Sequence, residues 1–231
     1  MAVGQPALDA RKNPAVSARQ WITLLSPLAV IGICQAAARW LTPVFGDQTI
    51  YPWLLIYWVV TGAWITWGAG WTGIQRWGGR PLGSWLWSAL AVIFLPITLP
   101  IFFDGWRMIS AEGMWLPWLL FAPINSLFEE GYWRGLLLDA ARPQQGRAFP
   151  GWAAVLYSSL FFSLNHASLG GFVKAYASPM AMVTPILAGL IYGLVYWKTH
   201  SLRWAFASHT LVNWFGLGIL VLLNIYIPPM P

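Results

Sequence analysis

Two neighbouring carboxylates and an arginine stand within an otherwise apolar stretch of the chain, at Glu129, Glu130 and Arg134. Neighbouring residues on an α-helix point about 100° apart, so the two glutamates face different directions. Glu130 precedes Arg134 by four positions, which is the favourable order for an ion pair on one helix face. We therefore expect Arg134 to neutralise Glu130 and to leave Glu129 turned toward another helix, as a candidate general base.

Two further pairs of residues occur later in the chain, each at the spacing of one helical turn. Phe162 lies four positions before His166, and His209 lies four positions before Asn213, so each pair shares a helix face. Glu129 with His166 has the chemistry to hold and activate a water molecule. His209 and Asn213 have donors for the oxyanion that develops on a scissile carbonyl. Together the three segments predict water-mediated hydrolysis of a peptide bond.

Each of these features also has a simpler structural interpretation. A buried pair such as Glu130 and Arg134 is often only a clamp, and a membrane histidine often only bonds a neighbouring helix. Depth in a membrane is a further test, if these helices cross one. Residues counted from the cytoplasmic ends of parallel helices place Glu129 about 16 Å deep and His166 about 23 Å deep. The combination across three segments favours catalysis, with His166 as the member that fits least well.

Composition decides what kind of element must carry these groups. Of 231 residues, 58% are hydrophobic and only 9% are charged, whereas soluble domains carry about 25% charged residues. The single cysteine, Cys34, excludes a disulfide scaffold and a cysteine-rich metal site. The 13 lysines and arginines stand singly or in pairs between apolar runs, which argues against a nucleic-acid partner despite the net charge of +6. The sequence therefore predicts a polytopic membrane protein.

The predicted fold class is all-α, a bundle of transmembrane helices. A spanning helix needs about 20 apolar residues. Pro96 and Pro100 in the third candidate segment, and Pro117 and Pro123 in the fourth, can break a helix, so an eighth or discontinuous span is compatible with the pattern. The seven candidate segments are 21–40, 51–71, 85–103, 115–140, 151–167, 180–197 and 203–227.

Basic residues alternate between the two ends of these segments. Nine of them lie in the N-terminal tail and in the second, fourth and sixth loops, whereas three lie on the alternate side. The positive-inside rule therefore predicts a cytoplasmic N-terminus and a C-terminus outside. We divide the chain into a cytoplasmic tail, 1–20, and a single transmembrane domain, 21–231. A cleaved signal peptide in the first segment fits less well, because the charge alternation requires that segment to be retained.

Glycine and tryptophan positions add two expectations about packing. Gly189 and Gly193 form a Gly-x-x-x-Gly pair, which we expect to bring two helices of the same chain close together. Several tryptophans fall at segment ends, where an aromatic belt would meet the membrane surface. These tryptophans are Trp21, Trp40, Trp53, Trp71, Trp85, Trp115 and Trp204.

The polar motifs, in this order, resemble those of the CPBP family of intramembrane proteases, which includes the CAAX-processing endopeptidases and bacteriocin-processing or immunity proteins. The resemblance covers residues 115–215, nearly half of the chain. Two positions depart from the family pattern: Gly131, where a larger apolar residue is common, and His200, where glycine is common. The motifs are Glu129-Glu130-x-x-x-Arg134, Phe162-x-x-x-His166 and His209-x-x-x-Asn213.

The resemblance implies a glutamic-type intramembrane endopeptidase whose site is buried in the bilayer. By position, Glu129 would be the base that activates water with the help of His166, and His209 with Asn213 would form the oxyanion hole. The supporting residues carried over in the same way are Glu130, Arg134 and Phe162.

We expect the site to work without a cofactor. Glu129 and two histidines are chemically sufficient to bind Zn²⁺, but no His-Glu-x-x-His helix occurs, so zinc is the less favoured alternative. The expected partners are a membrane-associated protein or peptide substrate and the lipid bilayer, in a bacterial inner membrane. A catalytically inactive immunity or accessory protein and a small transporter are the competing interpretations.

Overall fold

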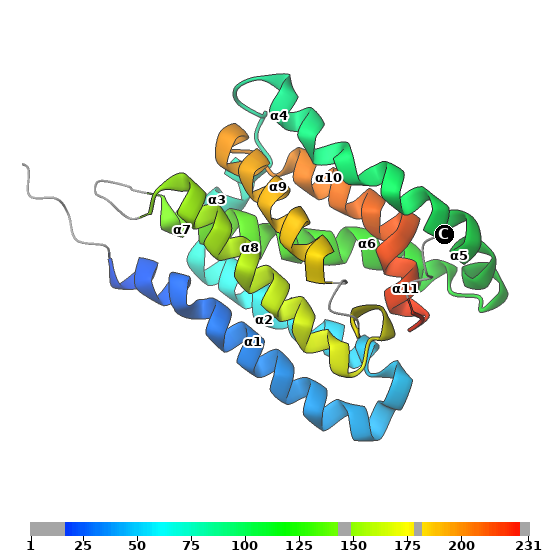
Figure 1. Cartoon of the computed structure of the whole chain (residues 1–231). Helices are drawn as coiled ribbons and strands as arrows, with labels where there is room; N and C mark the ends of the chain where they lie inside the picture. Colours follow the sequence, from blue (N-terminus) through cyan, green and yellow to red (C-terminus); the bar gives the residue numbers. More distant parts are fainter. Residues whose placement is uncertain (1–16, 143–148, 178–181, 227–231) are drawn as a thin grey trace, which may run out of the picture.

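The computed structural model of the chain describes residues 17–142, 149–177 and 182–226, and its secondary structure within these ranges is helical (Figure 1). The predicted all-α fold class is therefore confirmed. The α-helices are α1 (Ala18–Phe45), α2 (Ile50–Gly68), α3 (Gly70–Trp77), α4 (Trp85–Leu90), α5 (Leu95–Ala111), α6 (Trp115–Glu129), α7 (Leu137–Ala141), α8 (Gly151–Ala167), α9 (Val183–Thr199), α10 (Arg203–Val212) and α11 (Gly218–Leu222).

Each of the seven predicted segments is helical over most of its described length. The first segment begins slightly earlier than predicted, at Ala18, because Ser17 caps the helix: its Oγ accepts a hydrogen bond from the Gln20 N–H, and the Gln20 side chain accepts one from the Ser17 N–H. The predicted segment ends at 180 and 227 lie outside the described residues.

Three helices in the described part of the chain are long and apolar enough to cross a membrane by themselves: Ala18–Gln48, Ile50–Gly68 and Arg203–Leu222. A bent pair, Trp85–Phe94 with Thr98–Ala111, makes a fourth if it is counted as one span. Fewer helices meet this condition than the seven predicted spans because of their length and polarity. Helices α8 and α9 have only 17 residues each, and the α6–α7 stretch carries several charged groups.

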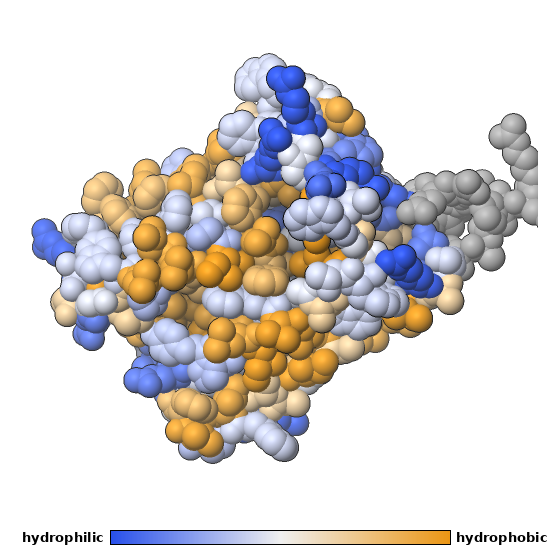
Figure 2. All heavy atoms as spheres, turned by 180° about the vertical axis from the view of Figure 1, so that it is seen from behind, coloured by the Kyte–Doolittle hydropathy of each residue, from blue (hydrophilic) through white to orange (hydrophobic). Residues whose placement is uncertain are grey.

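The surface is that of an integral membrane protein. Figure 2 shows hydrophobic side chains over much of one face, and large apolar side chains such as Val44 and Val59 stay more than two-thirds exposed. Most of the predicted aromatic-belt tryptophans are exposed, Trp40 and Trp85 among them. Trp53 is the exception: it is buried, its Nε1–H donates to the Cys34 carbonyl, and its ring stacks on Tyr57, so it joins α1 to α2 instead of meeting the membrane surface.

The third predicted segment is broken, as its prolines indicated. The 3₁₀ segment Ala91–Phe94 separates α4 from α5, and the helix pair bends by 44°. In the 3₁₀ segment the Leu95 N–H bonds to the Val92 carbonyl, which leaves the Ala91 carbonyl without its usual helical donor. The Ser208 hydroxyl of α10 donates to that carbonyl at 2.5 Å, so the break is held against α10. The fourth segment, in contrast, passes through Pro123 without interruption.

Two stretches of π-helix occur in the described part of the chain, and each begins at a residue that the sequence singled out. Glu130–Leu136 joins α6 to α7, and Asn213–Leu217 joins α10 to α11. A π-helical turn accommodates extra residues and changes the direction of the side chains that follow, which is why such turns are frequent at functional sites. The local geometry around Glu130 and Asn213 is therefore not that of the ideal α-helix assumed from spacing.

Helices α8 and α9 approach closely because of two glycines. A Cβ added at Gly189 would lie 2.9 Å from the Ser159 Cα, and one at Gly193 would lie 3.1 Å from the Val155 Cγ1. The Gly-x-x-x-Gly pair thus packs two helices of one chain together, as the sequence predicted. This contact places α8, and with it His166, against the remainder of the bundle.

Candidate active site

Glu129 lies beside both of the histidines that the sequence grouped with it. Its Oε1 is 3.9 Å from His166 Nε2, and its Oε2 is 3.3 Å from His209 Nε2. The three residues come from α6, α8 and α10, and each retains less than a tenth of its surface. The structure therefore brings the predicted carboxylate and both imidazoles together inside the bundle.

The depth expected for His166 is wrong. Counting along parallel helices put this residue about 7 Å deeper than Glu129, yet the two side chains are 3.9 Å apart. The helices are not parallel: α8 runs obliquely to α6 (Figure 1), so equal distances along the two helices do not correspond to equal depths. Helix crossing angles are set by side-chain packing, which residue counting ignores.

The ring of His166 has a defined hydrogen-bonding pattern. Its Nδ1 lies 2.9 Å from the Phe162 carbonyl oxygen, one helical turn earlier. Because a carbonyl oxygen only accepts, Nδ1 carries the proton and donates. In the neutral ring Nε2 is then an acceptor, and it is this atom that faces Glu129. The Phe162 ring also packs edge-on against the imidazole, with centroids 4.3 Å apart.

Glu130 and Arg134 form the ion pair that their spacing predicted. Arg134 Nη1 lies 3.1 Å from Glu130 Oε1, and both side chains are almost completely buried. The guanidinium also lies over the Phe162 ring, 4.1 Å from its centroid, in a cation–π contact. Phe162 therefore contacts both Arg134 and His166, which gives a physical reason for its place in the motif.

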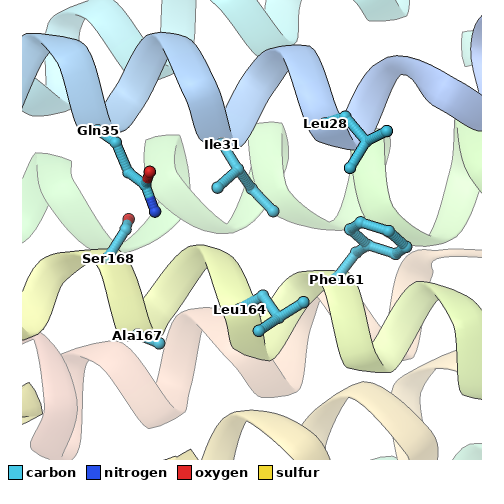
Figure 3. Close-up of a pocket in the computed structure, with 7 residues that line it drawn as sticks. All are labelled: Leu28, Ile31, Gln35, Phe161, Leu164, Ala167 and Ser168. Carbon is cyan, nitrogen blue, oxygen red and sulfur yellow. The ribbon is translucent and has the colours of Figure 1, made fainter.

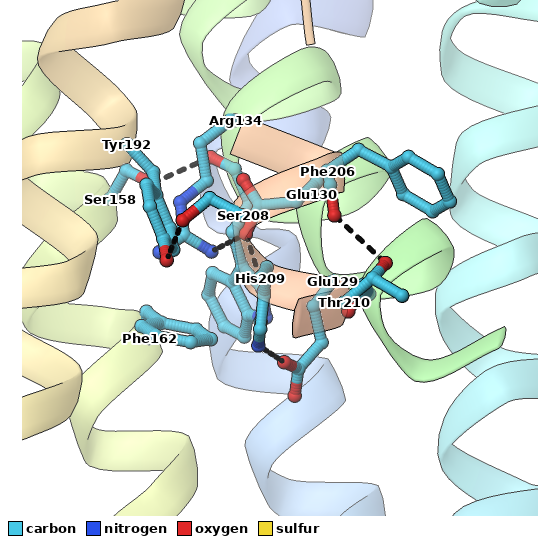
Figure 4. Close-up of polar contacts among 12 residues, drawn as sticks. Glu129, Glu130, Arg134, Ser158, Phe162, Tyr192, Phe206, Ser208, His209 and Thr210 are labelled. Carbon is cyan, nitrogen blue, oxygen red and sulfur yellow. Dashed lines mark hydrogen bonds and ion pairs between the residues drawn. The ribbon is translucent and has the colours of Figure 1, made fainter. Parts of the chain in front are cut away.

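The position of His209 differs most from the sequence-based expectation. Its Nδ1 lies 2.7 Å from Glu130 Oε1, while its Nε2 faces Glu129, so the ring stands between the two carboxylates (Figure 4). The Tyr192 ring stacks on it at 5.8 Å, and the Tyr192 hydroxyl lies 3.1 Å from Ser208 Oγ. The four-residue spacing between His209 and Asn213 could not predict the contact of His209 with Glu130, because that contact joins α10 to the π segment after α6.

Asn213 is buried on the same side of the bundle but contacts a residue that the sequence reading missed. Its Nδ2 donates to Ser126 Oγ at 3.3 Å. Ser126 lies on α6 three positions before Glu129, so both point to one face of that helix. The spacing Ser126-x-x-Glu129 was visible in the sequence, but a serine in an apolar helix is too common a feature to identify a site.

The two departures from the family pattern have structural explanations. A Cβ at Gly131 would lie 3.0 Å from Ile65 Cδ1, so Ile65 fills the space that a larger residue would occupy. His200 ends α9 with a φ of 56°, in the left-handed region that glycine enters without strain. Burial of His200, reinforced by the Arg142 guanidinium, lowers the pKa of this imidazole, and Arg142 Nη1 lies 2.8 Å from its Nε2.

A shallow groove lies on another face of α8. It has a volume of about 300 Å³ and runs between α1 and α8, with Leu28 and Gln35 on one wall and Leu164 and Ser168 on the other (Figure 3). None of the predicted site residues lines it. Among the residues that the structure describes, no group of three or more His, Cys, Asp and Glu side chains has a metal-binding arrangement.

Residues 111–215 match the family model described as type II CAAX prenyl endopeptidase Rce1-like. The matched range contains all three motifs and the first residues of both π-helical stretches, Glu130 and Asn213. The match confirms the resemblance to the CPBP intramembrane proteases and supports a CAAX-protease-type hydrolase, and a protease family of this kind implies a protein or peptide substrate. Searches of curated proteins and of solved structures found no match.

Proposed function

We propose that the protein is an intramembrane endopeptidase in which Glu129 and His166 activate water and His209 and Asn213 stabilise the oxyanion. The observation that carries the proposal is the meeting of Glu129 with two imidazoles from separate helices inside an apolar bundle. Ionisable groups cost at least about 2.5 kcal/mol each in the centre of a membrane helix, so a buried cluster of them is typical of function.

The gap between Glu129 and His166 suits a bridging water. A separation of 3.9 Å is too long for a direct hydrogen bond between Oε1 and Nε2. A water about 2.8 Å from both atoms would meet them at an angle of about 90°, close enough to its own H–O–H angle to donate one proton to each. Its lone pairs would then point away from Glu129 and His166, toward a substrate carbonyl.

The reaction balances with these groups alone. The water oxygen attacks the carbonyl carbon while Glu129 takes the proton that the water loses. The carbonyl oxygen becomes an oxyanion, which accepts hydrogen bonds from His209 and from the second N–H of the Asn213 amide, the first being bound to Ser126. Collapse of the tetrahedral intermediate breaks the C–N bond, and Glu129 returns its proton to the leaving amine.

Glu130, Arg134 and Phe162 would support this chemistry without touching the substrate. Glu130 contacts the His209 ring, Arg134 compensates the charge of Glu130, and Phe162 packs against both Arg134 and His166. Removing one charged member of such a buried pair leaves an uncompensated charge, which costs about 3–5 kcal/mol.

We further propose seven crossings with the N-terminus in the cytoplasm, in a bacterial inner membrane. The distribution of basic residues supports this orientation, and the helical segments agree with the predicted division. Single cysteines in a Cys34→Ala background test it, because Cys34 is the only natural thiol. A cysteine in place of Gly79 should react with an impermeant reagent only from the cytoplasmic side, and one in place of Gly113 only from outside.

Replacement of Glu129 by glutamine tests the enzymatic proposal directly. The Glu129→Gln variant should accumulate uncut precursors in the membrane proteome, whereas wild type should not. Glu112→Gln is a matched control, because it makes the same chemical change at an exposed carboxylate beyond the end of α5. Cleavage by a folded Glu129→Gln variant would refute the proposed role of Glu129. A cellular phenotype that survives loss of Glu129, His166 and His209 would instead favour a catalytically idle relative that acts as an immunity or accessory protein.

A further inference from the structure

The imidazole of His166 contacts two aromatic rings. The Phe162 ring lies edge-on to it with centroids 4.3 Å apart, and the Tyr176 ring lies edge-on with centroids 5.2 Å apart. Phe162 is buried and belongs to α8, the helix that carries His166 itself. Tyr176 is half-buried and ends the 3₁₀ turn Lys174–Tyr176, which follows α8 in the chain. The more exposed of the two rings is therefore supplied by a separate segment.

The 3₁₀ turn folds back closely onto the end of α8. The Val173 N–H donates to the Leu169 carbonyl at 2.8 Å, and the Tyr176 N–H donates to the Val173 carbonyl at 2.9 Å. A Cβ added at Gly170 would lie 2.8 Å from the Tyr176 carbonyl oxygen, so only a glycine lets the two backbones approach this closely. Val173 is completely buried, which fixes the middle of this segment.

One buried amide, that of Asn224, clamps the same turn from the other side. Its Oδ1 accepts from the Lys174 N–H at 2.8 Å, and its Nδ2 donates to the Phe172 carbonyl at 3.1 Å and to the Asp47 carbonyl at 3.2 Å. Both donors of the amide are thus used. The backbone of Asn224 is left-handed, with a φ of 48°, a conformation that asparagine enters more readily than most residues. A single side chain therefore joins three segments that are far apart in the chain.

An exposed ion pair lies beside this clamp and contributes less. Lys174 Nζ is 2.9 Å from Asp47 Oδ2, but the Asp47 side chain is 73% exposed, and solvent weakens such a pair. The buried amide of Asn224 therefore holds the turn more firmly than the ion pair does. Asp47 and Asn224 both lie outside residues 111–215, so the clamp is additional to the motifs that match the family.

The orientation of the His166 ring depends on its neighbours. The χ2 torsion of a histidine has broad minima, so the contacts around the ring decide where its nitrogens point. Phe162 supplies two of them, its ring and its carbonyl oxygen, which lies 2.9 Å from Nδ1. Tyr176 supplies a contact from outside α8.

We infer that Tyr176 and Asn224 are positioning residues for His166. Asn224 fixes the 3₁₀ turn, the turn places the Tyr176 ring against the imidazole, and the ring keeps Nε2 directed at Glu129, 3.9 Å away. The consequence for catalysis rests on the proposed function, because the proposed water lies in that gap. Neither residue touches the reacting atoms, so both act through His166.

Chemical modification of the full-length protein in liposomes tests the inference without any substrate. Diethyl pyrocarbonate acylates accessible imidazole nitrogens, and mass spectrometry of the peptides reports each of the three histidines separately. Exposed His200 is the internal reference. Tyr176→Ala should raise the acylation rate of His166 about 10-fold relative to His200, the effect of losing one aromatic pair. The rate of His209, which stacks on Tyr192 instead, should not change.

Variants of Tyr176 itself separate the ring from its hydroxyl. Tyr176→Phe keeps the ring and should recover the wild-type protection of His166. Tyr176→Leu fills much of the same volume without a ring and should leave His166 reactive, so the test does not depend on the stability of the alanine variant. Unchanged His166 reactivity in both Tyr176→Ala and Tyr176→Leu would overturn the inference.

Asn224→Gly tests the clamp, because glycine keeps the left-handed backbone and removes only the amide. His166 should become about as reactive as in Tyr176→Ala. The double variant should be no more reactive than Tyr176→Ala alone, since Asn224 acts through the ring. Lys174→Gln is the matched control: it removes the ion pair, keeps the backbone N–H that Asn224 binds, and should protect His166 as wild type does. An equal rise at all three histidines would contradict the inference, because the variants would then loosen the whole bundle.

Activity separates this inference from the proposed function. Tyr176→Ala should lower kcat about 10-fold or more with a small effect on KM, because a misplaced His166 impairs the reaction and leaves substrate binding intact. If wild type cleaves no membrane peptide although Tyr176 and Asn224 protect His166 as expected, the proposed function fails and the positioning role stands. If wild type cleaves while Tyr176→Ala changes neither kcat nor the reactivity of His166, only the inference fails.

Discussion

Packing between α8 and α9 offers a test of how the fold positions His166. In a Gly189→Ala variant the new Cβ would lie 2.9 Å from the Ser159 Cα, and ordinary contact begins at 3.4 Å. The helices must therefore separate by 0.5 Å or more, against backbone that cannot rotate away. Overpacking of this kind costs about 1–3 kcal/mol, partly offset by about 0.5–1 kcal/mol from the better helix propensity of alanine.

The displacement should also reach the site. Ser159 and His166 lie seven residues, or about 10 Å, apart on the same rigid helix, so α8 carries the shift to the gap between His166 and Glu129. Misplacement of about 1 Å can cost about 10²-fold in rate. We expect Gly189→Ala to unfold at lower temperature in detergent and to lose about 10-fold or more in kcat.

Gly32→Ala is the matched control, because a Cβ there meets nothing within 4 Å. It should leave kcat unchanged and raise the free energy of unfolding by about 0.5–1 kcal/mol through helix propensity. Equal stability and activity of Gly189→Ala and Gly32→Ala would refute the argument that α9 sets the position of α8.

The remaining predictions concern single groups. Ser126→Ala removes the acceptor that orients Asn213, so kcat should fall about 10-fold while the fold is retained; unchanged kinetics would show that Asn213 needs no such partner. His200→Gly should raise the free energy of unfolding by about 1 kcal/mol in thermal melts by relieving the left-handed backbone, and a lower stability would mean that the Arg142 contact outweighs the strain. The lowered pKa of His200 means that the unfolded chain binds more protons below its ordinary pKa of 6.5, so stability should decrease as pH falls below that value, and His200→Asn should flatten this slope. Cleavage should persist in EDTA; loss of activity that Zn²⁺ restores would instead support a metal-dependent site.

Much of the molecule follows from local properties of the sequence. Long apolar runs with few charges predict membrane helices, and the bend between Phe94 and Thr98 follows from Pro96, which lacks an N–H. The Glu130–Arg134 ion pair was predictable because both partners lie one turn apart on the same segment, and even the π-helical geometry does not separate them. These features depend on residues near one another in the chain.

The relations between segments were decided by the tertiary structure. The sequence identified Glu129, His166 and His209 as polar groups in apolar helices, but it contained no measure of how those helices cross, and residue counting misplaced His166 for that reason. The position of His209 between Glu129 and Glu130 depends on the packing of α10 against the π segment, and the burial of Trp53 depends on α1 lying beside α2. Spacing along one helix restricts directions within that helix alone, whereas the distances across a site are set by the side chains that fill the space between helices.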